Sequence, residues 1–578
     1  MSQASRQIVE PELNPQQEAA VSESKSTLVL SGAGTGKTRV ITARIARLLA
    51  EGVAPDRILA ATFTNKAATE MKERIGSPHL VRDLYIGTFH SLSARLLRQH
   101  PEETGLPSNF RIIDSGDQLA IIRRILHEDL EQSKYTDGGP DPREMRAAIN
   151  KLKESGLRSD SVTRIMAGDL VRKAYAIYEE NLAAEKKADF IELILRCNEL
   201  LRDNPAVRKK WSDHFQHVLI DELQDISDMQ MTWISLLRGR HTIYFGVGDD
   251  DQSIYAFRGA NPSLMVDFKS KFAKNNIHRL EHNYRSSNRI LELANTVITS
   301  NRDRIGKNLI GTGESGELPR YSCFPTDEEE AQAITLEISR LVATGVGVGS
   351  IAIFYRNHAL SQIIEQQLRS HNIPFRVRGS QRFYERPEVK AVIAYLSAAS
   401  NPEDDESVLE TINNPRRGVG EAMIRKLREA AGSRPLWHVL GDVKPEKIKD
   451  YVKCIEKIAA TAKKSLPKAV EVAINDSGLR AHYESKGARE RERIEHMSEV
   501  VSEAARFVES GSRELSEFLA HVSLEGDASD GPGDQISLMT IHAAKGLEFD
   551  HVFVAGVEDG VLPPIAAFGQ LTFRGNSF

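Results

Sequence analysis

Two kinds of hydrophobic pattern alternate along this chain. Short runs of aliphatic and β-branched residues are each followed by the start of a helical pattern, which is typical of buried parallel strands in an α/β sheet. We expect strands at seven such runs: Thr27–Leu30, Ile58–Phe63, Val218–Asp221, Thr242–Val247, Ile351–Tyr355, Ile536–Thr540 and Val552–Val557.

The second pattern places Leu, Ile and Ala at helical spacing among charged residues. It covers two long stretches, from about Ser91 to Lys210 and from about Arg386 to Leu524. The segment Gln132–Pro142 is rich in Gly, Asp and Pro and is predicted to be a surface loop, and Glu525–Asp534 is predicted to be a linker. The alternation predicts an α/β fold with two cores, each interrupted by a mostly helical insertion.

Composition and charge limit the class of protein. The chain has 578 residues, of which 27% are charged and 40% hydrophobic, so a largely disordered chain is excluded. Cys197, Cys323 and Cys454 lie far apart without a CxxC pair, which excludes a disulfide framework, a zinc ribbon and an iron–sulfur cluster. The net charge of −5 excludes a globally basic nucleic-acid binder but leaves room for a local basic groove.

The sequence also predicts a cytoplasmic protein that does not bind membranes. No apolar run approaches the ~18–20 residues that a membrane-spanning helix needs. The first residues lack the charged-then-apolar layout of a signal peptide.

A glycine-rich loop follows the first predicted strand and precedes a predicted helix at Arg39–Ala50. It reads Ser31-Gly32-Ala33-Gly34-Thr35-Gly36-Lys37-Thr38. In such a loop the backbone N–H groups surround phosphates, the lysine reaches the β- and γ-phosphate oxygens, and the threonine hydroxyl binds Mg²⁺. The strict pattern has glycine where Ser31 stands, and an ordinary glycine turn before a helix is the alternative.

An acidic pair ends the third predicted strand. Asp221 would bind Mg²⁺ there and Glu222 would act on the attacking water, although an acidic pair is also common where a helix begins. Asp221 lies 184 residues after Lys37, which is more than a compact α/β core needs between these strands. We therefore expect an inserted domain between them.

Further motifs follow in a fixed order along the chain: Leu13–Gln17, Ala61–Ala68, Gly87–Ser91, Asp221–Asp225, Gly248–Gly259, Asn283–Ser287 and Thr540–Phe549. Together with the glycine-rich loop they resemble the Q, Ia, Ib, II, III, IV and V motifs of the UvrD/Rep-type superfamily 1 DNA helicases. The resemblance extends from Leu13 to Pro563. One departure is Phe257, because the family usually has tryptophan at that position.

The resemblance implies an ATP site with Mg²⁺. The implied catalytic residues are Lys37, Asp221, Glu222, Gln252 and Arg285. The implied nucleotide-binding residues are Gln17, Gly32, Ala33, Gly34, Thr35, Gly36, Lys37, Thr38, Arg39, Tyr284, Arg285 and Glu548, and the metal ligands are Thr38 and Asp221. A solvated surface pair is the alternative for Tyr284 and Arg285, and a helix cap is the alternative for Glu548.

The resemblance also implies binding of single-stranded DNA and of junctions between single and double strands. Phe63, Tyr255 and Phe257, with Phe190 as a weaker candidate, would stack on bases, although a place in the core is the alternative for each ring. Polar contacts to the DNA backbone would come from Thr64, Asn65, Thr88, His90, Thr540 and His542. No metal-ligand spacing involves either histidine, so we expect no metal there.

Four interleaved subdomains would carry this activity. The first RecA-like core is expected at residues 1–88 and 204–280, interrupted by an insertion at 89–203. The second is expected at 281–379 and 535–578, interrupted by an insertion at 380–534. ATP hydrolysis between the cores would drive movement along DNA and strand separation, with the family's 3′ to 5′ polarity.

The end of the chain lowers the activity that we expect. Only 15 residues follow Pro563, whereas the family continues to motif VI and its arginine finger, and Arg574 has no such motif around it. We therefore expect this chain alone to bind ATP and single-stranded DNA but to hydrolyse ATP slowly and unwind poorly. A truncated or frameshifted product is the leading explanation, and a partner that supplies the arginine is the alternative.

Other functional classes remain open from the sequence. One is a DNA-dependent ATPase that translocates without unwinding, and another is a nucleotide-switched binding module. The cellular setting (repair, replication restart, plasmid transfer or phage defence), the oligomeric state and the protein partners also remain open.

Overall fold

The computed structural model describes residues 12–563 except 77, 131–139, 165, 257–258, 302–303, 314, 379–383, 385, 433, 442–445, 487–489, 510 and 525–534. It divides into two compact units. The first contains residues 1–286, 294–313 and 387–525, and the second contains 287–293, 314–386 and 526–578. The predicted loop at 132–142 and the predicted linker at 525–534 lie mostly or wholly outside the described residues.

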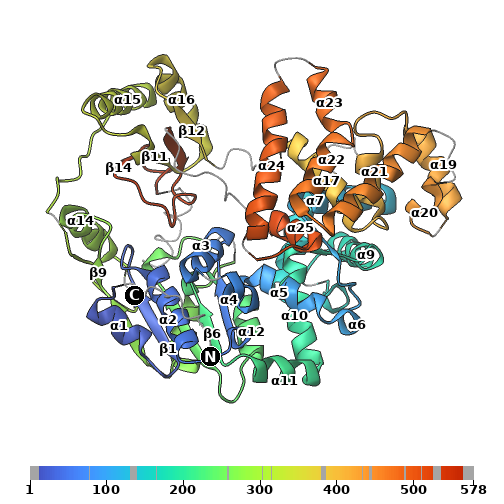
Figure 1. Ribbon diagram of the computed structural model, residues 1–578. Helices are drawn as coiled ribbons and strands as arrows, with labels where there is room; N and C mark the ends of the chain where they lie inside the picture. Colours follow the sequence, from blue (N-terminus) through green and yellow to red (C-terminus); the bar gives the residue numbers. More distant parts are fainter. Residues whose placement is uncertain are drawn as a thin grey trace, which may run out of the picture. The chain divides into compact units, whose positions relative to one another are not determined.

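A six-stranded parallel sheet forms the centre of the first unit (Figure 1). Its strand order is β3-β2-β6-β7-β1-β8, and every neighbouring pair runs parallel. The strands are β1 (Thr27–Ser31), β2 (Ile58–Thr62), β3 (Tyr85–Thr88), β6 (His217–Ile220), β7 (Ile243–Gly248) and β8 (Ile277–Leu280). Because all six run in one direction, their carboxyl ends meet at a single edge of the sheet.

Alternate strand residues face the two sides of this sheet. Leu28 and Leu30 join a core with helices α5, α10, α12 and α13, whereas Val29 joins a core with α1, α2 and α3. These helices are α1 (Pro15–Val21), α2 (Lys37–Ala50), α3 (Asn65–Ile75), α5 (Phe89–Arg98), α10 (Phe190–Asp203), α12 (Asp228–Leu236) and α13 (Ser263–Lys271). Burial on both faces explains why the strand sequences are continuously apolar.

The segment between β3 and β6 is mostly helical, as expected. Its remaining helices are α6 (Pro101–Thr104), α7 (Ser115–Arg124), α8 (Pro142–Glu154), α9 (Asp169–Ala184) and α11 (Pro205–His214), and α4 (Pro78–Asp83) precedes β3. It also contains two short parallel strands, β4 (Arg111–Ile113) and β5 (Lys187–Asp189). The helix predicted around Phe190 therefore begins at Phe190, because Asp189 caps it by accepting a hydrogen bond from Glu192 N.

Residues 387–524 form the other helical part of the first unit. The helices are α17 (Pro387–Ser400), α18 (Asp405–Ile412), α19 (Glu421–Ala431), α20 (Trp437–Leu440), α21 (Glu446–Ala462), α22 (Leu466–Asn475), α23 (Leu479–Glu484), α24 (Arg491–Glu509) and α25 (Leu515–Leu524). Helix α22 packs against α21 and α24, and α17 packs against α18.

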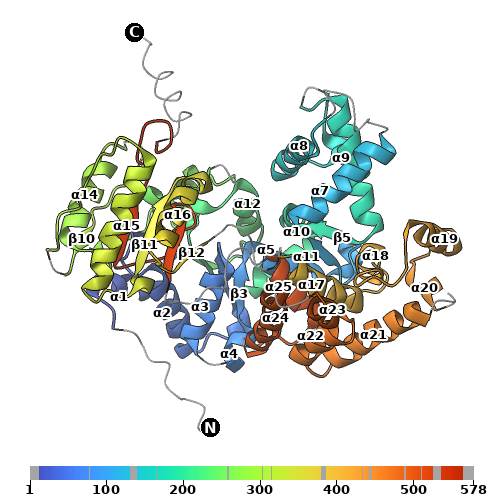
Figure 2. The same ribbon diagram turned by 90° about the horizontal axis from the view of Figure 1, so that it is seen from above.

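The second unit is built on a four-stranded parallel sheet, in the order β12-β13-β11-β14. The strands are β11 (Ile351–Tyr355), β12 (Phe375–Val377), β13 (Ile536–Thr540) and β14 (His551–Val554). Helices α15 (Asp327–Ala343) and α16 (Ser361–Ser370) lie beside β11 and β12 (Figure 2), where Ile334, Ile338 and Leu368 share a core with the strands. Both predicted α/β sheets, each interrupted in sequence by helices, are therefore present.

The link between the two sheets contributes short elements. β9 (His282–Asn283) and β10 (Ile310–Gly311) pair in parallel, and α14 (Asn288–Ile298) lies between them in sequence. No helix in the described part of the chain is both long and apolar enough to cross a membrane.

Candidate nucleotide and nucleic-acid site

Buried hydroxyl groups close the glycine-rich loop between β1 and α2. Ser31 Oγ lies 2.7 Å from Thr35 Oγ1, and Thr35 Oγ1 donates to Gly32 O at 2.9 Å. Gly34 and Gly36 have φ angles of 65° and 86°, in the left-handed region that favours glycine. Ser31, the single departure from the strict loop pattern, is thus part of the loop's own hydrogen bonding.

The acidic strand end lies at the same edge of the sheet. Asp221 directly follows β6, is 3% exposed, and accepts a hydrogen bond from Thr62 Oγ1 at 3.3 Å. Burial, together with the neighbouring charge of Glu222, raises the pKa of Asp221 to about 7, although Lys37 opposes the shift. Glu222 has a φ of 50°, a strained conformation that non-glycine residues adopt mainly at functional sites.

Lys37 brings the predicted catalytic side chains together. Its Nζ donates to Gln252 Oε1 at 3.3 Å and lies 3.6 Å from Glu222 Oε2. Gln252 Nε2 donates to Asp249 Oδ2, and Gln224 Nε2 donates to Glu222 Oε2. Asp249 N donates to Gln224 Oε1 at 2.9 Å, which closes a ring of polar contacts around the lysine.

The segment after β8 lies directly on the glycine-rich loop. Asn283 Nδ2 donates to Ala33 O at 2.6 Å, and Tyr284 N donates to Gly34 O at 2.9 Å. A Cβ atom on Gly34 would lie only 2.7 Å from Arg285 Cβ, so this approach requires glycine. The backbone of Arg285 is therefore held beside the loop that would surround the phosphates.

The start of α1 supports the same loop from the other side. Gln17 is 1% exposed, its Nε2 donates to Thr35 O at 2.9 Å, and its Oε1 accepts from Asn14 N at 3.0 Å. Asn14 Nδ2 donates to the hydroxyl of Tyr284 at 2.7 Å, and Tyr284 is 53% exposed. The Gln17 amide is thus engaged with the loop, Arg39 is exposed at the start of α2, and their contacts with nucleotide stay predictions.

The predicted Mg²⁺ ligands fit a divalent cation. Among the described residues Asp221 Oδ1 has no hydrogen-bond partner, although it is buried. A buried carboxylate oxygen without a donor is unfavourable unless a cation or a proton accompanies it, and Mg²⁺ prefers oxygen ligands. Thr38 is the second residue of α2 and half-buried, and its hydroxyl would supply the other oxygen that the loop pattern predicts.

The rings predicted to stack on DNA bases lie along the same sheet edge. Phe63, which follows β2, and Tyr255, in the segment after β7, stack with ring centroids 5.1 Å apart and planes at 19°. Thr64 caps α3 by accepting from Ala67 N at 3.2 Å. Within the described chain Asn65 Nδ2 is buried without an acceptor, and its contact with a phosphate oxygen stays a prediction.

The residues after β3 are less accessible than the motif suggested. Thr88 is 5% exposed and caps α5 by accepting from Ser91 N at 3.2 Å. The His90 ring meets the Phe190 ring edge to face at 6.0 Å, and burial lowers the pKa of His90 to about 4. His90 is therefore neutral at physiological pH, and Phe190 packs against the core of the first unit.

Other predicted residues belong to the second unit or fall outside the described residues. Phe257 and Arg574 are outside the described residues, so the stacking ring and the missing motif VI stay predictions. Thr540, His542 and Glu548 belong to the second unit, where Thr540 Oγ1 accepts from Ala543 N at 3.2 Å and Glu548 is exposed.

The structure also adds residues that the motifs did not single out. Gln224 and Asp249 complete the ring around Lys37, and Asn283 braces the loop. The ammonium group of Lys307 contacts the carboxylates of three consecutive aspartates, Asp249, Asp250 and Asp251. The run of three aspartates in the sequence was the available signal, since adjacent carboxylates require a cation.

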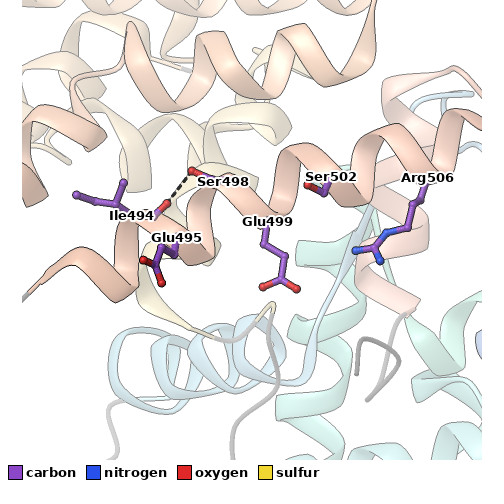
Figure 3. A pocket seen from close by; sticks show the side chains of 6 residues that line it. All are labelled: Ile494, Glu495, Ser498, Glu499, Ser502 and Arg506. Carbon is purple, nitrogen blue, oxygen red and sulfur yellow. Dashed lines mark hydrogen bonds between the residues drawn. The ribbon is translucent and has the colours of Figure 1, made fainter. Parts of the chain in front are cut away.

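A groove of about 620 Å³ lies on a different element, helix α24 (Figure 3). Its lining side chains all come from that helix: Ile494, Glu495, Ser498, Glu499, Ser502 and Arg506. Ser498 Oγ donates back to Ile494 O at 2.9 Å. With two carboxylates and one guanidinium group, this groove is unsuited to phosphate and is separate from the strand-end site.

Three features meet at one edge of a parallel sheet: a glycine-rich loop, a buried aspartate at a strand end, and a polar side chain that contacts the loop lysine. Together they define a P-loop nucleoside triphosphatase. Comparison with known families narrows this class. Residues 13–273 match the UvrD/REP helicase N-terminal domain, and residues 278–571 match the UvrD-like helicase C-terminal domain. The chain belongs to the UvrD-like helicase family.

The chain is also similar to curated DNA helicases over most of its length. DNA helicase II of Haemophilus influenzae is 37% identical over 574 residues, which is 94% of this chain and 78% of that protein. DNA helicase II of Escherichia coli is 36% identical over 579 residues, covering 95% and 79%. The ATP-dependent DNA helicase PcrA of Staphylococcus aureus is 34% identical over 582 residues, covering 96% and 79%.

Proposed function

We propose that this chain is an ATP-dependent DNA helicase that moves along single-stranded DNA. One observation carries the proposal. Gln252, which contacts the loop lysine, and Tyr255, which stacks on Phe63, belong to one short segment after β7. A change at the phosphate is thereby linked to the rings that would hold bases.

The residues around Lys37 fit ATP hydrolysis. Lys37 would bind β- and γ-phosphate oxygens, and Glu222 would orient a water and accept its proton as the water attacks the γ-phosphorus and the bond to the β-phosphate oxygen breaks. Arg285 would stabilise the charge that builds up on the transferred group. Mg²⁺ held by Thr38 and Asp221 would neutralise phosphate charge when it is bound.

The residues on the β2 and β3 side fit a nucleic-acid strand. Base stacking on Phe63 and Tyr255 tolerates any sequence, and the buried Asn65 amide offers a donor to the backbone. Movement in the 3′ to 5′ direction and a preference for junctions rest on the family resemblance, and the proposed cytoplasmic location rests on the sequence features given above. The named relatives support the helicase assignment.

The decisive experiment is ATP turnover by the purified chain with and without single-stranded DNA. Turnover stimulated by DNA is expected for the wild type and for Lys25→Ala, an exposed control. Lys37→Ala should abolish turnover while circular dichroism and much of the single-strand affinity stay unchanged, because Lys37 contacts phosphate rather than DNA.

Two results would contradict the proposal. Normal ATP turnover in Lys37→Ala would contradict the assignment of the glycine-rich loop to ATP. Turnover that DNA does not stimulate in the wild type would contradict the coupling of ATP hydrolysis to DNA binding. A parallel unwinding assay separates a helicase from an ATPase that only translocates, and substrates with a 3′ or a 5′ single-stranded tail test the polarity.

A further inference from the structure

A buried lysine outside the predicted motifs contacts the segment that carries Gln252. The side chain of Lys307 is 2% exposed. Its Nζ lies 2.5 Å from Asp249 Oδ1, 2.9 Å from Asp250 Oδ1 and 2.7 Å from Asp251 Oδ2. Three carboxylates converge on one ammonium group, whose three N–H donors match them in number.

The three aspartates also satisfy the spacing of a cation site, since their ligand oxygens lie within 4.8 Å of one another. The ammonium group of Lys307 contacts all three and takes the place that a metal ion would need. Burial alone would lower the pKa of Lys307, but the carboxylates, Asp249 above all, outweigh burial and raise it. Lys307 therefore stays charged at physiological pH.

The segment 304–309 that carries Lys307 has other contacts at the same edge. Arg304 Nη2 lies 2.6 Å from Asp251 Oδ2, and Ile305 N donates to Asp250 Oδ2 at 2.6 Å. A Cβ atom on Gly32 would lie 2.2 Å from Leu309 Cδ2, so the segment also touches the glycine-rich loop. It spans the distance between the loop and the segment after β7.

Lys307 acts on Gln252 through the two oxygens of Asp249. One oxygen accepts from Lys307, and the other accepts from Gln252 Nε2. A carboxylate can only accept and a lysine can only donate, so these neighbours allow one orientation of the Gln252 amide. Its nitrogen faces Asp249 and its oxygen faces Lys37 at 3.3 Å.

We propose that Lys307 is a positioning residue for ATP hydrolysis, which holds the Asp249 carboxylate in place so that Gln252 presents its carbonyl oxygen to the nucleotide site. In that orientation Gln252 accepts hydrogen bonds, which suits the attacking water or Lys37 rather than a phosphate oxygen. The inference rests on the proposed function, because it assigns Gln252 to the ATP site.

The first test compares Lys307→Met with Arg304→Met. Both remove one cation from the same segment and the same carboxylate cluster, but Arg304 contacts Asp251 and the backbone oxygen of Lys307, and not Asp249. We expect Lys307→Met to lower kcat for DNA-stimulated ATP hydrolysis by about 10- to 100-fold, with KM for ATP changed less than about threefold, because misplaced groups affect mainly the chemical step. Arg304→Met should stay within about twofold in kcat, although both variants lower the melting temperature.

A double-mutant cycle separates positioning from general damage. In a Gln252→Ala background Lys307→Met should reduce kcat by less than about twofold further, since residues acting as a unit are not additive. An equal loss in both backgrounds, or an unchanged kcat in Lys307→Met alone, would overturn the inference.

A milder variant covers the case in which Lys307→Met does not fold. Asp249→Asn keeps the shape of the side chain and leaves Lys307 two carboxylates, but its amide can donate to Gln252 and reverse the Gln252 amide. We expect the same loss of kcat and the same non-additivity with Gln252→Ala. Additive losses with this variant count against the inference as directly as with Lys307→Met.

A binding measurement keeps this inference distinct from the proposed function. The ratio of ATPγS affinity to ADP affinity reports contacts at the γ-phosphate and needs no turnover. Lys307→Met and Gln252→Ala should change this ratio equally, whereas Arg304→Met leaves it as in the wild type. A wild type without turnover would remove the helicase proposal, and a ratio that responds to Gln252→Ala but not to Lys307→Met would remove this one.

Discussion

Among single residues, Asp221 is held in the least favourable electrostatic environment of the site. Its buried carboxyl has a pKa raised to about 7, beside Glu222 and with one oxygen that has no hydrogen-bond partner among the described residues. A buried carboxyl in this position lowers the stability of the chain, and the proposed Mg²⁺ would relieve that cost.

Asp221→Asn should therefore stabilise the chain while it abolishes ATP turnover. The folded state holds the Asp221 proton up to about pH 7, whereas the unfolded state loses it near pH 4, so the wild type loses stability as the pH rises between these values. The melting temperature of the variant, measured without nucleotide or metal, should exceed that of the wild type by at least ~2 °C at pH 8, and by less at pH 5. An equal difference at both pH values would contradict the raised pKa.

Substitution of Tyr255 tests whether its ring only packs in the core or also contacts DNA. Tyr255→Ala should weaken the binding of single-stranded DNA by ~1–3 kcal/mol if a base stacks there, while Tyr255→Phe keeps the ring and the affinity. Fluorescence anisotropy at several salt concentrations measures both, and binding should fall with salt through counterion release. The same loss is expected for Phe257→Ala. Unchanged affinity in Tyr255→Ala would leave its stack on Phe63 as packing alone.

Among the elements, the strand-to-helix connections determine the geometry of the site. β1, β2 and β3 each end at the same edge and are followed closely by α2, α3 and α5. Two of these helices begin with a threonine cap, Thr64 for α3 and Thr88 for α5. Three residues that the family resemblance assigns to DNA therefore also lie where a strand gives way to a helix: Thr64, Asn65 and Thr88.

Thr88→Ala should lower the free energy of unfolding by about 1 kcal/mol, because α5 loses its cap. Thr88→Ser keeps the hydroxyl and should keep the stability. Because Thr88 is only 5% exposed, we expect single-strand affinity to change little in either variant. Urea unfolding and DNA titration measure the two effects, and a large loss of affinity with unchanged stability would assign Thr88 to DNA instead.

The sequence predicted the elements whose signal is local. All seven predicted strands are present, and Ile351–Tyr355 and Ile536–Thr540 have the predicted bounds. The last run ends at Val554 rather than Val557 because Gly556 adopts a φ of 69°. The strands missed among the described residues have only two to four residues each, too few to show a period of their own: β3, β4, β5, β8, β9, β10 and β12.

The site divides in the same way. The loop, the acidic pair and Gln252 could be named because their residue types and spacing encode the chemistry. Lys307 could not be named from the sequence, because its role depends on three aspartates more than fifty residues away in the chain, which only the fold brings into contact with it.

At the scale of the molecule, the first unit joins helical segments that are distant in sequence. Asp404, which precedes α18, lies 2.8 Å from Arg111 of β4 and 3.1 Å from Lys187 of β5. Lys187 is fully buried, and Arg98 Nη2 donates to Ser516 O at 3.3 Å nearby in the same unit. The buried charges thus connect the helices after Pro387 to the segment between β3 and β6.

Asp404→Asn should destabilise the first unit by about 1.5–3 kcal/mol at pH 7, because Arg111 and Lys187 lose their most buried carboxylate and keep only the more exposed Asp117, Glu185 and Glu406. Burial alone would raise the pKa of Asp404, but Arg111 and Lys187 hold it at about 2. The stabilisation is therefore complete above pH 4 and is lost as the pH falls toward 2. Unfolding at pH 7 and pH 3 should show a smaller difference at pH 3, and Glu403→Gln, an exposed neighbour, should show none.

The segment after β7 has a consequence for how this chain tolerates changes in length. Gln252 and Tyr255 are separated by two residues, so the side chain that contacts Lys37 and the ring that stacks on Phe63 share one short peptide. An insertion or deletion of one residue between them would leave both side chains intact yet turn the ring away from its partner. Such a variant would hydrolyse ATP without moving along DNA.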